Sequence, residues 1–362
     1  NSVNSDGDDA IANGAVLYTL ERRAAAGSVV LTPFDSTGAT QFNPSVAVFE
    51  TVPTIFTDLA GLDDFLSRFQ GQGGASNPGG VSQALLDFST TNDNTFYARI
   101  TGQQSDRDLT NILRTNVDTT STELSMGFDV PMYEGGSGTL FGGFNFAYLN
   151  SDSTITSFAG LGSVENEVFG YTFSAFYLTD AGFYVDGRYR FSFFDSNIIV
   201  ASGLGALGLV TEGTANSASL EVGKLIGLSN GLTLIPQLQV QHVDVSSNPL
   251  VDPLTGTAVG VITDGETTTG RVGLWVERAS ARNTIFGSVN IFHDFSGTKT
   301  TNFAGIPFSS KREDTRLELG VGGEVAVGAN STVFGRVFAA GGLGDWTADE
   351  TYTATAGFRL NF

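Results

Sequence analysis

The sequence contains no cysteine and only two histidines, and these absences exclude several classes of protein. Without cysteine, neither a disulfide framework nor a thiolate metal site can form. Basic residues are also scarce, with 18 Lys and Arg against 38 Asp and Glu and a formal net charge of −20. Because phosphate binding needs a basic surface, this balance argues against a nucleic-acid partner. We expect no cofactor.

Long hydrophobic runs are absent as well. No stretch approaches the roughly 18 consecutive apolar residues of a transmembrane helix. A membrane protein is not excluded, because a closed β-barrel crosses lipid with strands that are only weakly apolar. Glycine (46 residues) and phenylalanine (29) are abundant, which suits twisted strands and rings at membrane interfaces. No secretion signal precedes Asn1, so we expect a mature or trimmed chain.

The last eleven residues alternate strictly between apolar and polar side chains. In an extended strand such residues point to opposite faces. Aromatic rings stand at both ends of the apolar face, as on a strand that meets lipid; the alternative is the buried last strand of a soluble sandwich. The apolar face comprises Tyr352, Ala354, Ala356, Phe358, Leu360 and Phe362.

The same period of two recurs from Thr95 to the end of the chain and predicts about twelve strands. Short turns such as Thr179–Gly182 alternate with longer connections such as Asp195–Thr214. This alternation is typical of outer-membrane barrels, which have tight periplasmic turns and long external loops. The predicted fold class is therefore all-β: an antiparallel transmembrane barrel of about twelve strands, with an N-terminal α/coil segment that can place part of itself in the lumen.

Charged residues fall on the face opposite the apolar series. On a soluble protein they would form the solvated face, whereas in a barrel they line a lumen, where water and partner charges reduce the desolvation cost. We predict lumen-facing positions for Arg99, Glu123, Asp129, Asp186, Arg188, Arg190, Glu221, Arg271, Glu318, Glu324, Arg336 and Arg359.

Residues 1–93 lack this alternation, and we predict a passenger remnant or linker with short helices, followed by a barrel over residues 94–362. Ile11–Ala26 and Val81–Phe88 are possible short helices. Thr54–Phe69 carries an apolar stripe at helical spacing. A twelve-stranded barrel has room for about one helix of roughly 10–12 Å diameter. Thr54–Phe69 is slightly favoured for that place, although its apolar stripe fits a polar lumen poorly and suits an extracellular cap equally well.

Seven segments carry a family resemblance: 96–102, 182–187, 193–195, 218–223, 234–239, 342–345 and 357–362. Through them, from Asn94 to Phe362, the chain resembles the translocator β-domain of type V autotransporters of Gram-negative outer membranes. The resemblance implies a twelve-stranded pore holding a helix, which brings an N-terminal passenger to the cell surface. It also implies that Tyr352, Phe358, Leu360 and Phe362 form the signal read by the barrel-assembly machinery. Residues 1–93 depart from the pattern, being short for a β-helical passenger and long for a luminal helix alone.

Catalytic and metal sites are not expected. His293 and Asp294 are adjacent on a predicted strand and point to opposite faces, so they cannot form a simple pair. The acidic start at residues 6–9 lacks the bidentate Glu of a calcium loop. The apolar segment Ile198–Val210 falls in a predicted external loop, where strand extension, packing over the pore mouth or a binding surface would each explain it.

The sequence thus predicts a non-enzymatic outer-membrane barrel that translocates and anchors an N-terminal passenger at the cell surface. The alternative is a stand-alone porin-like or structural barrel without a passenger. The predicted partners are outer-membrane lipid and lipopolysaccharide, the barrel-assembly machinery, and the chain's own passenger or linker. The N-terminal region would lie outside the cell or in the lumen.

Overall fold

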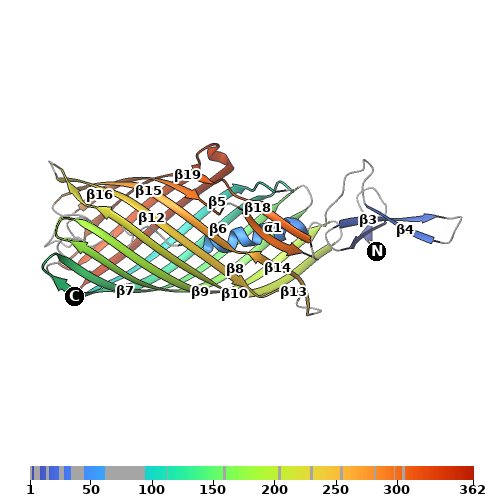
Figure 1. Cartoon of the computed structure of the whole chain (residues 1–362), viewed down its shortest axis with the longest axis horizontal. Coiled ribbons are helices and arrows are strands. Elements are labelled where there is room, and N and C mark those ends of the chain that lie inside the picture. Colours follow the sequence, from blue (N-terminus) through green and yellow to red (C-terminus); the bar gives the residue numbers. More distant parts are fainter. Residues whose placement is uncertain are drawn as a thin grey trace.

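The computed structural model places helix α1 with its following turn, over residues 45–61, and nearly all of residues 94–362 (Figure 1). Gaps in that second range fall at residues 112, 158–159, 203–204, 229–230, 253–255, 281–282, 297 and 304–305. Near the N-terminus it describes the backbone of residues 2–3, 9–13, 16–23 and 28–33. The predicted helix at Val81–Phe88 lies outside the described residues, as do positions 62–69 of the predicted helix Thr54–Phe69.

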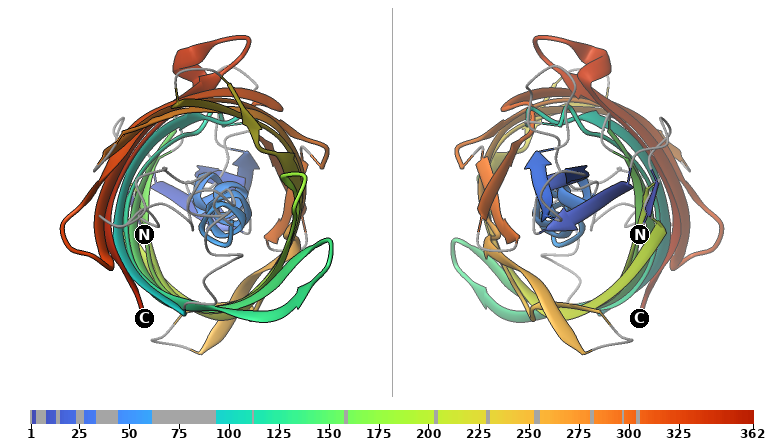
Figure 2. Two further views of the ribbon diagram at one scale, coloured as in Figure 1. Left: turned by 90° about the vertical axis from the view of Figure 1, so that its left-hand side faces the viewer. Right: turned by 90° about the vertical axis from the view of Figure 1, so that its right-hand side faces the viewer.

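Twelve long antiparallel strands, paired in sequence order, close into a single barrel (Figures 1 and 2). The last strand pairs with the first over a continuous register from Asp349↔Arg107 to Asn361↔Thr95. All twelve alternating segments of the sequence lie in these strands, so the predicted fold class is confirmed. The strands are β5 (Thr95–Asp108), β6 (Asn116–Gly135), β7 (Gly138–Thr156), β8 (Leu161–Thr179), β9 (Phe183–Ser202), β10 (Gly205–Lys224), β12 (Leu232–Ser247), β15 (Glu266–Ala279), β16 (Asn283–Asp294), β19 (Thr315–Ala326), β20 (Ser331–Gly342) and β21 (Asp349–Asn361).

The two rims of the barrel differ. The rim that holds the C-terminus carries tight turns, such as the one in which Gly182 adopts a positive φ of 79°, a conformation that costs glycine little. There Phe362 and Asn94 exchange two backbone hydrogen bonds of 2.9 Å. At the opposite rim, two hairpins extend the wall: β13 (Leu250–Asp252) with β14 (Thr257–Asp264), and β17 (Thr298–Phe303) with β18 (Ile306–Lys311). The remaining short elements are β11 (Ile226–Gly227) and the 3-10 helix η2 (Trp346–Ala348).

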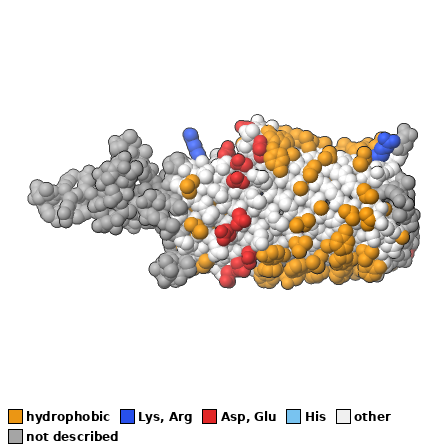
Figure 3. Space-filling model, turned by 180° about the vertical axis from the view of Figure 1, so that it is seen from behind, with side chains coloured by type: hydrophobic (Ala, Val, Ile, Leu, Met, Phe, Trp, Pro, Cys, Tyr) orange, Lys and Arg blue, Asp and Glu red, His pale blue; other side chains and the backbone are white. Residues whose placement is uncertain are grey.

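On the face shown in Figure 3, a belt of apolar side chains covers the half of the barrel nearest the C-terminus, and a band of acidic side chains borders it. Exposed large apolar residues occur on β5, β6, β8, β9, β10 and every long strand from β12 to β21. Outward residues of the belt are strongly exposed, for example Phe173 at 57% and Val272 at 61%. The acidic residues stand directly opposite one another on neighbouring strands, as Glu167, Asp195 and Glu212 do across β8, β9 and β10. The belt fits the lipid-facing surface of an outer-membrane barrel, with the acidic band at its outer edge.

Two predictions for the N-terminal region were wrong in part. Where a helix was predicted at Ile11–Ala26, the backbone forms strands β2 (Asp9–Asn13) and β3 (Val16–Arg23). These belong to a four-stranded antiparallel sheet with β1 (Ser2–Val3) and β4 (Ser28–Pro33). The pairing of Asn13 with Val16 explains the difference. Val16, Tyr18 and Thr19 favour a strand, and pairing with β2 and β4 outweighs weak helical spacing.

The main helix also begins earlier than predicted. Helix α1 runs from Ser45 to Leu59, with Pro53 inside it. A proline in a helix interior costs about 3 kcal/mol or more, which makes Val46–Val52 look unhelical in the sequence. Tertiary packing offsets this cost, because every side chain from Val46 to Thr57 is buried. Among the described helices, none is long and apolar enough to cross a membrane.

Candidate functional site

Helix α1 occupies the lumen of the barrel, toward the rim opposite the C-terminus (Figures 1 and 2). Its most extensive contacts are with seven strands of the wall, namely β7, β8, β9, β12, β14, β17 and β18. Gly162 on β8 allows one close approach, because a Cβ there would overlap the Val48 side chain. The helix is therefore enclosed on all sides and fills this part of the lumen.

The inner wall around α1 is largely apolar. Its side chains form one hydrophobic core with the helix, and the rings of Phe56 and Phe194 lie 4.5 Å apart. The predicted mismatch between an apolar helix and a polar lumen therefore does not arise at this level. Segment Ile198–Val210 extends β9 and β10, and its side chains at Ile198, Val200 and Leu209 contribute to the core. Other wall residues of this core are Val164, Val168, Val243, Val245, Leu250 and Phe308.

Most of α1 lies beyond the apolar belt. On β9, the exposed belt residue Phe193 is followed by inward-facing Phe194 and by outward-facing Asp195 of the acidic band. The helix contacts Phe194 near its C-terminal end, and its core continues along β9 to Ile198 and Val200. Helix α1 is consequently held in the part of the wall that extends above the membrane.

Below the helix the lumen is polar, and the sequence-predicted charged residues are found there. Asp129, Asp186, Arg188, Arg190, Glu221, Arg271, Glu324, Arg336 and Arg359 are buried inside the barrel. Arg99 and Glu123 have side chains that are 12% and 14% exposed, and Glu318 is half-buried. Nine of these side chains form five ion pairs, two of which share Glu123. The pairs are Arg271–Glu221 (2.7 Å), Arg188–Asp186 (2.8 Å), Arg190–Glu123 (3.4 Å), Arg99–Glu123 (3.7 Å) and Arg359–Asp129 (3.9 Å).

Arg271 is the centre of the most extensive of these networks. Its Nη2 donates to Glu221 at 2.7 Å, and its Nε donates to Gln239 at 2.8 Å. Its Nη1 donates to Asn290 at 2.9 Å, and Asn290 in turn donates to Glu318 at 2.8 Å. Pairing and hydrogen bonding of this kind offset the desolvation cost of burying these charges.

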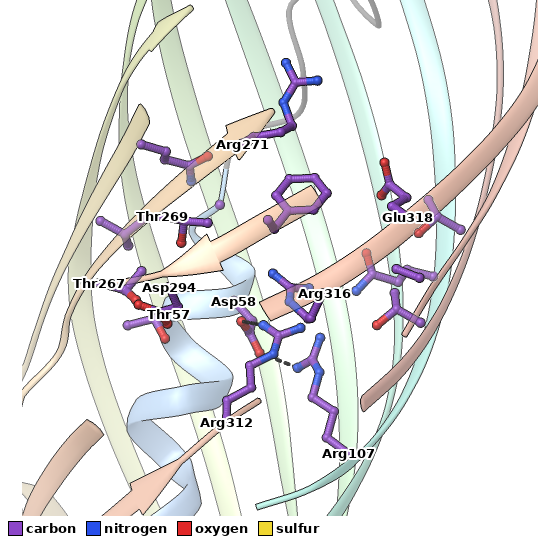
Figure 4. Close-up of a pocket in the computed structure, with 18 of the residues that line it drawn as sticks. Thr57, Asp58, Arg107, Thr267, Thr269, Arg271, Asp294, Arg312, Arg316 and Glu318 are labelled. Carbon is purple, nitrogen blue, oxygen red and sulfur yellow. Dashed lines mark hydrogen bonds and ion pairs between the residues drawn. The ribbon is translucent and has the colours of Figure 1, made fainter. Parts of the chain in front are cut away.

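The C-terminal end of α1 joins the polar zone through a charge cluster that the sequence did not reveal (Figure 4). Asp58 accepts hydrogen bonds from Arg107 of β5 and, at 2.7 Å, from Arg312 after β18. The same two arginines contact Asp349 of β21, with Arg312 Nε 2.5 Å and Arg107 Nε 3.3 Å from the carboxylate. Arg316 lies 3.9 Å from Asp349. Two carboxylates thus share three guanidinium groups, and Asp58 ties the helix to the wall.

Hydrogen bonds from the wall also reach the last carbonyl groups of the helix. The Ser217 hydroxyl donates to the Ala60 carbonyl at 2.5 Å, and Arg190 Nη1 donates to the Gly61 carbonyl at 3.5 Å. Such carbonyls have no partner within a helix, and a cation near them is favourable. The polar zone therefore holds the helix end by both side-chain and backbone groups.

Two polar cavities flank this end of the helix. One, of about 260 Å³, lies among Asp58, Arg271, Arg316 and Glu318. The other, of about 210 Å³, lies between Asp58 and Glu123. Both are large enough to hold water. The helix therefore closes the upper lumen, whereas some space remains beside its lower end.

Replacing Asp58 by Asn should weaken retention of the helix. The substitution leaves Arg107, Arg312 and Arg316 with one carboxylate, and we expect a loss of about 2 kcal/mol, reduced from the fully buried case because Asp58 is partly exposed. Single-channel recording of the purified barrel would show more frequent opening. The matched substitution Asp345→Asn, in an exposed loop, should leave the closed fraction unchanged; equal opening in both variants would contradict the assignment.

Of the other candidate residues, Asp294 lines the luminal cavity, whereas His293 and the apolar residues of β21 lie on the outer face. Tyr352, Phe358, Leu360 and Phe362 are 51%, 47%, 40% and 64% exposed. His293 is hydrogen-bonded to the Thr315 hydroxyl at 2.8 Å, whereas Asp294 accepts from Thr267 at 3.0 Å. Among the described residues there is no group of three or more His, Asp or Glu side chains that could hold a metal ion.

Comparison with known proteins points to one family. Residues 96–337 match the family described as autotransporter beta-domain. The adhesin BmaC autotransporter of Brucella suis biovar 1 (strain 1330) is 25% identical over 342 residues, which are 88% of this chain and 10% of that protein. The pertactin autotransporter of Bordetella bronchiseptica is 28% identical over 198 residues, 52% of this chain and 20% of that protein. The chain thus spans a tenth to a fifth of the curated relatives it matches.

Solved structures agree in fold. The transport unit of the autotransporter AIDA-I from Escherichia coli has a TM-score of 0.66 at 16% identity and covers 89% of this chain and all of its own. The translocator domain of the autotransporter NalP from Neisseria meningitidis has a TM-score of 0.64 at 13% identity and covers 88% of this chain and all of its own. At these identities the likeness concerns the barrel fold alone.

Proposed function

This chain belongs to the autotransporter family, whose β-domain it contains, and on that basis we propose separate roles for residues 1–93 and 94–362. The barrel is an outer-membrane translocator of a Gram-negative bacterium. In our proposal residues 1–93 are the linker or remnant of a passenger that the barrel brings to the cell surface. Residues 94–362 then serve as pore and membrane anchor.

The observation that carries this proposal is the path of the chain. Helix α1 lies in the lumen, strand β5 begins at the rim that holds the C-terminus, and β3 and β4 lie beyond the opposite rim (Figure 1). A chain that runs from outside the cell to a periplasmic first strand has to pass through the pore. The paired charges of the polar zone and the Asp58 cluster would hold this linker once transport has ended.

Three partners follow from the proposed role. The passenger is joined to the N-terminal region, whereas lipid and lipopolysaccharide surround the belt and the acidic band. The barrel-assembly machinery would read the outward residues of β21. A porin-like barrel without a passenger is the alternative, and α1 argues against it because the helix fills the upper lumen.

Surface display tests the proposal directly. An epitope-tagged reporter fused ahead of Asn1 should appear on intact cells of a Gram-negative host, where added protease removes it. A reporter attached to residues 1–93 alone should stay inside the cell envelope, because no pore and no anchor accompany it. Equal protection of the reporter from protease in both fusions would refute a translocator role while leaving the barrel fold untouched.

A further inference from the structure

Helix α1 acts as a plug in the upper lumen, and one of its carboxyl groups has no hydrogen-bond partner in the structure. Glu50 on α1 is 1% exposed, and neither of its carboxylate oxygens is hydrogen-bonded. A buried, unpaired carboxylate is costly, so an unsatisfied group of this kind requires an explanation. The Asp58 cluster at the other end of the helix does not provide one.

Glu50 belongs to a polar stripe along one face of α1. Glu50, Thr54 and Thr57 follow the spacing that places residues on one helix face. Thr54 lies 3.3 Å from Ser310 of β18, a distance between their hydroxyl oxygens. Strand β17 makes the most extensive contact with α1, and its Thr301 hydroxyl is also buried without a partner. The stripe therefore faces the β17–β18 hairpin, which is part of the wall above the membrane.

Few charges on the surrounding strands can compensate Glu50. The buried cation on β17 is Lys299, whose ammonium group donates to the backbone carbonyl of Glu266. On β18, Lys311 pairs with Asp314 at 2.7 Å. The other described charged side chains of the strands around α1 point outward or lie deeper in the lumen: Asp152 on β7, Glu165 and Glu167 on β8, Asp186, Arg188, Arg190 and Asp195 on β9, and Asp244 on β12.

We propose that Glu50 is a protonation-controlled latch for the plug: α1 stays in the lumen while the Glu50 carboxyl is neutral, and loss of its proton favours release of the helix. This proposal needs only that α1 fills the barrel, and it holds whether or not a passenger has been carried. The group sits above the apolar belt, in the part of the barrel nearest the cell exterior, where the external medium sets the pH.

The direction of the effect follows from proton binding. Burial raises the pKa of Glu50 from 4.5 to about 7 when the helix is in place. In a released, hydrated helix the pKa returns to its ordinary value, so the plugged state binds the proton more tightly. Retention is then strongest below about pH 4.5 and weakens as the pH rises through about 7. Between about pH 5 and about pH 8 the ratio of plugged to open barrels should fall on the order of 50-fold.

The lack of native cysteine makes a clean test available. Thr51 on α1 is 0% exposed, and Thr51→Cys introduces one buried thiol of similar size. The rate at which a hydrophilic maleimide labels this thiol in the purified full chain reports opening of the plug. Each rate is divided by that of Ser137→Cys, an exposed turn position, which removes the pH dependence of the thiol itself. We expect the normalised rate to rise on the order of 50-fold from about pH 5 to about pH 8.

Glu50→Gln in the Thr51→Cys background should label slowly at both pH values, because its side chain cannot ionise. Glu212→Gln, an outward acid of the neighbouring wall, should keep the full response. Heat-modifiable migration on gels confirms that each barrel is folded, and Glu50→Leu serves as a second neutral variant if Glu50→Gln does not fold. A flat labelling rate in the parent protein, or an equal pH response in the neutral variants, overturns the latch. Surface display of a passenger is measured separately, so its failure would not be confused with failure of the latch.

Discussion

Excision of residues 45–61 should convert a nearly closed barrel into a conducting pore. The helix fills the upper lumen, and two polar cavities of about 260 and 210 Å³ lie beside its end. A barrel of twelve strands without a plug is wider than one whose side chains fill the interior, so we expect single-channel conductance to rise roughly tenfold or more. Planar bilayer recordings of the purified proteins would measure this change.

The excised barrel should still fold. Its wall is held by continuous strand pairing around the whole circumference, which does not involve the helix. Apolar wall residues such as Ile198 and Phe308 would become exposed to water, at about 1.5–3 kcal/mol for each side chain, so thermal stability should decrease. Removing residues 9–33 provides the matched control, because it shortens the N-terminal region and leaves α1 in place. An unchanged conductance after excision of the helix, with the barrel folded, would show that α1 is not the plug.

Phe362→Ala should severely reduce the amount of barrel in the outer membrane. Phe362 is 64% exposed on the outer face, so its ring contributes little to packing within the chain. An effect on assembly would therefore come from recognition of the last strand. We expect roughly a tenfold lower yield of folded protein in membrane fractions, with a loss of lipid-facing burial of only about 2 kcal/mol as a secondary cause.

Phe295 offers the matching control for this experiment. Its ring is 67% exposed, comparable to that of Phe362, and it lies at the other end of the barrel after β16. Phe295→Ala removes the same surface area and should change the membrane yield by less than about twofold. Similar losses in both variants would indicate a general requirement for outer aromatic rings. Normal insertion of Phe362→Ala would argue against an assembly signal in β21.

The strands were predictable because one physical rule governs the part of the wall that meets lipid. There, Val185 and Tyr189 face outward and Asp186 and Arg188 face inward. The polarity of each side chain therefore shows whether it faces lipid or the lumen. The rule fails above the membrane. At Ile198 the inner wall meets an apolar helix, and the sequence then lacks the alternation that would mark a lumen.

The charge cluster was missed for a related reason. Arg107 and Asp349 lie at the outer ends of β5 and β21, beyond the segments that alternation marks as lipid-facing. Their inward direction follows from the strand period once the strands are known to extend that far. Arg312 lies in a connection between strands, where no period applies, so its contact with Asp58 depends on the folded wall. Helix α1 begins earlier than predicted because packing that only the closed barrel supplies keeps Val46–Val52 helical ahead of Pro53.

The acidic band makes the cohesion of the upper wall depend on dissolved salt. Glu350, Asp106 and Asp118 stand abreast on β21, β5 and β6, as Asp244 and Glu266 do on β12 and β15. Neighbouring charges of one sign push such strands apart, and this repulsion reaches about 30 Å at 0.01 M ionic strength but only about 10 Å at 0.1 M. Below the band, lipid encloses the wall and no such repulsion acts. The upper wall that encloses α1 is therefore the part of the barrel whose strand pairing weakens most when the salt concentration is lowered.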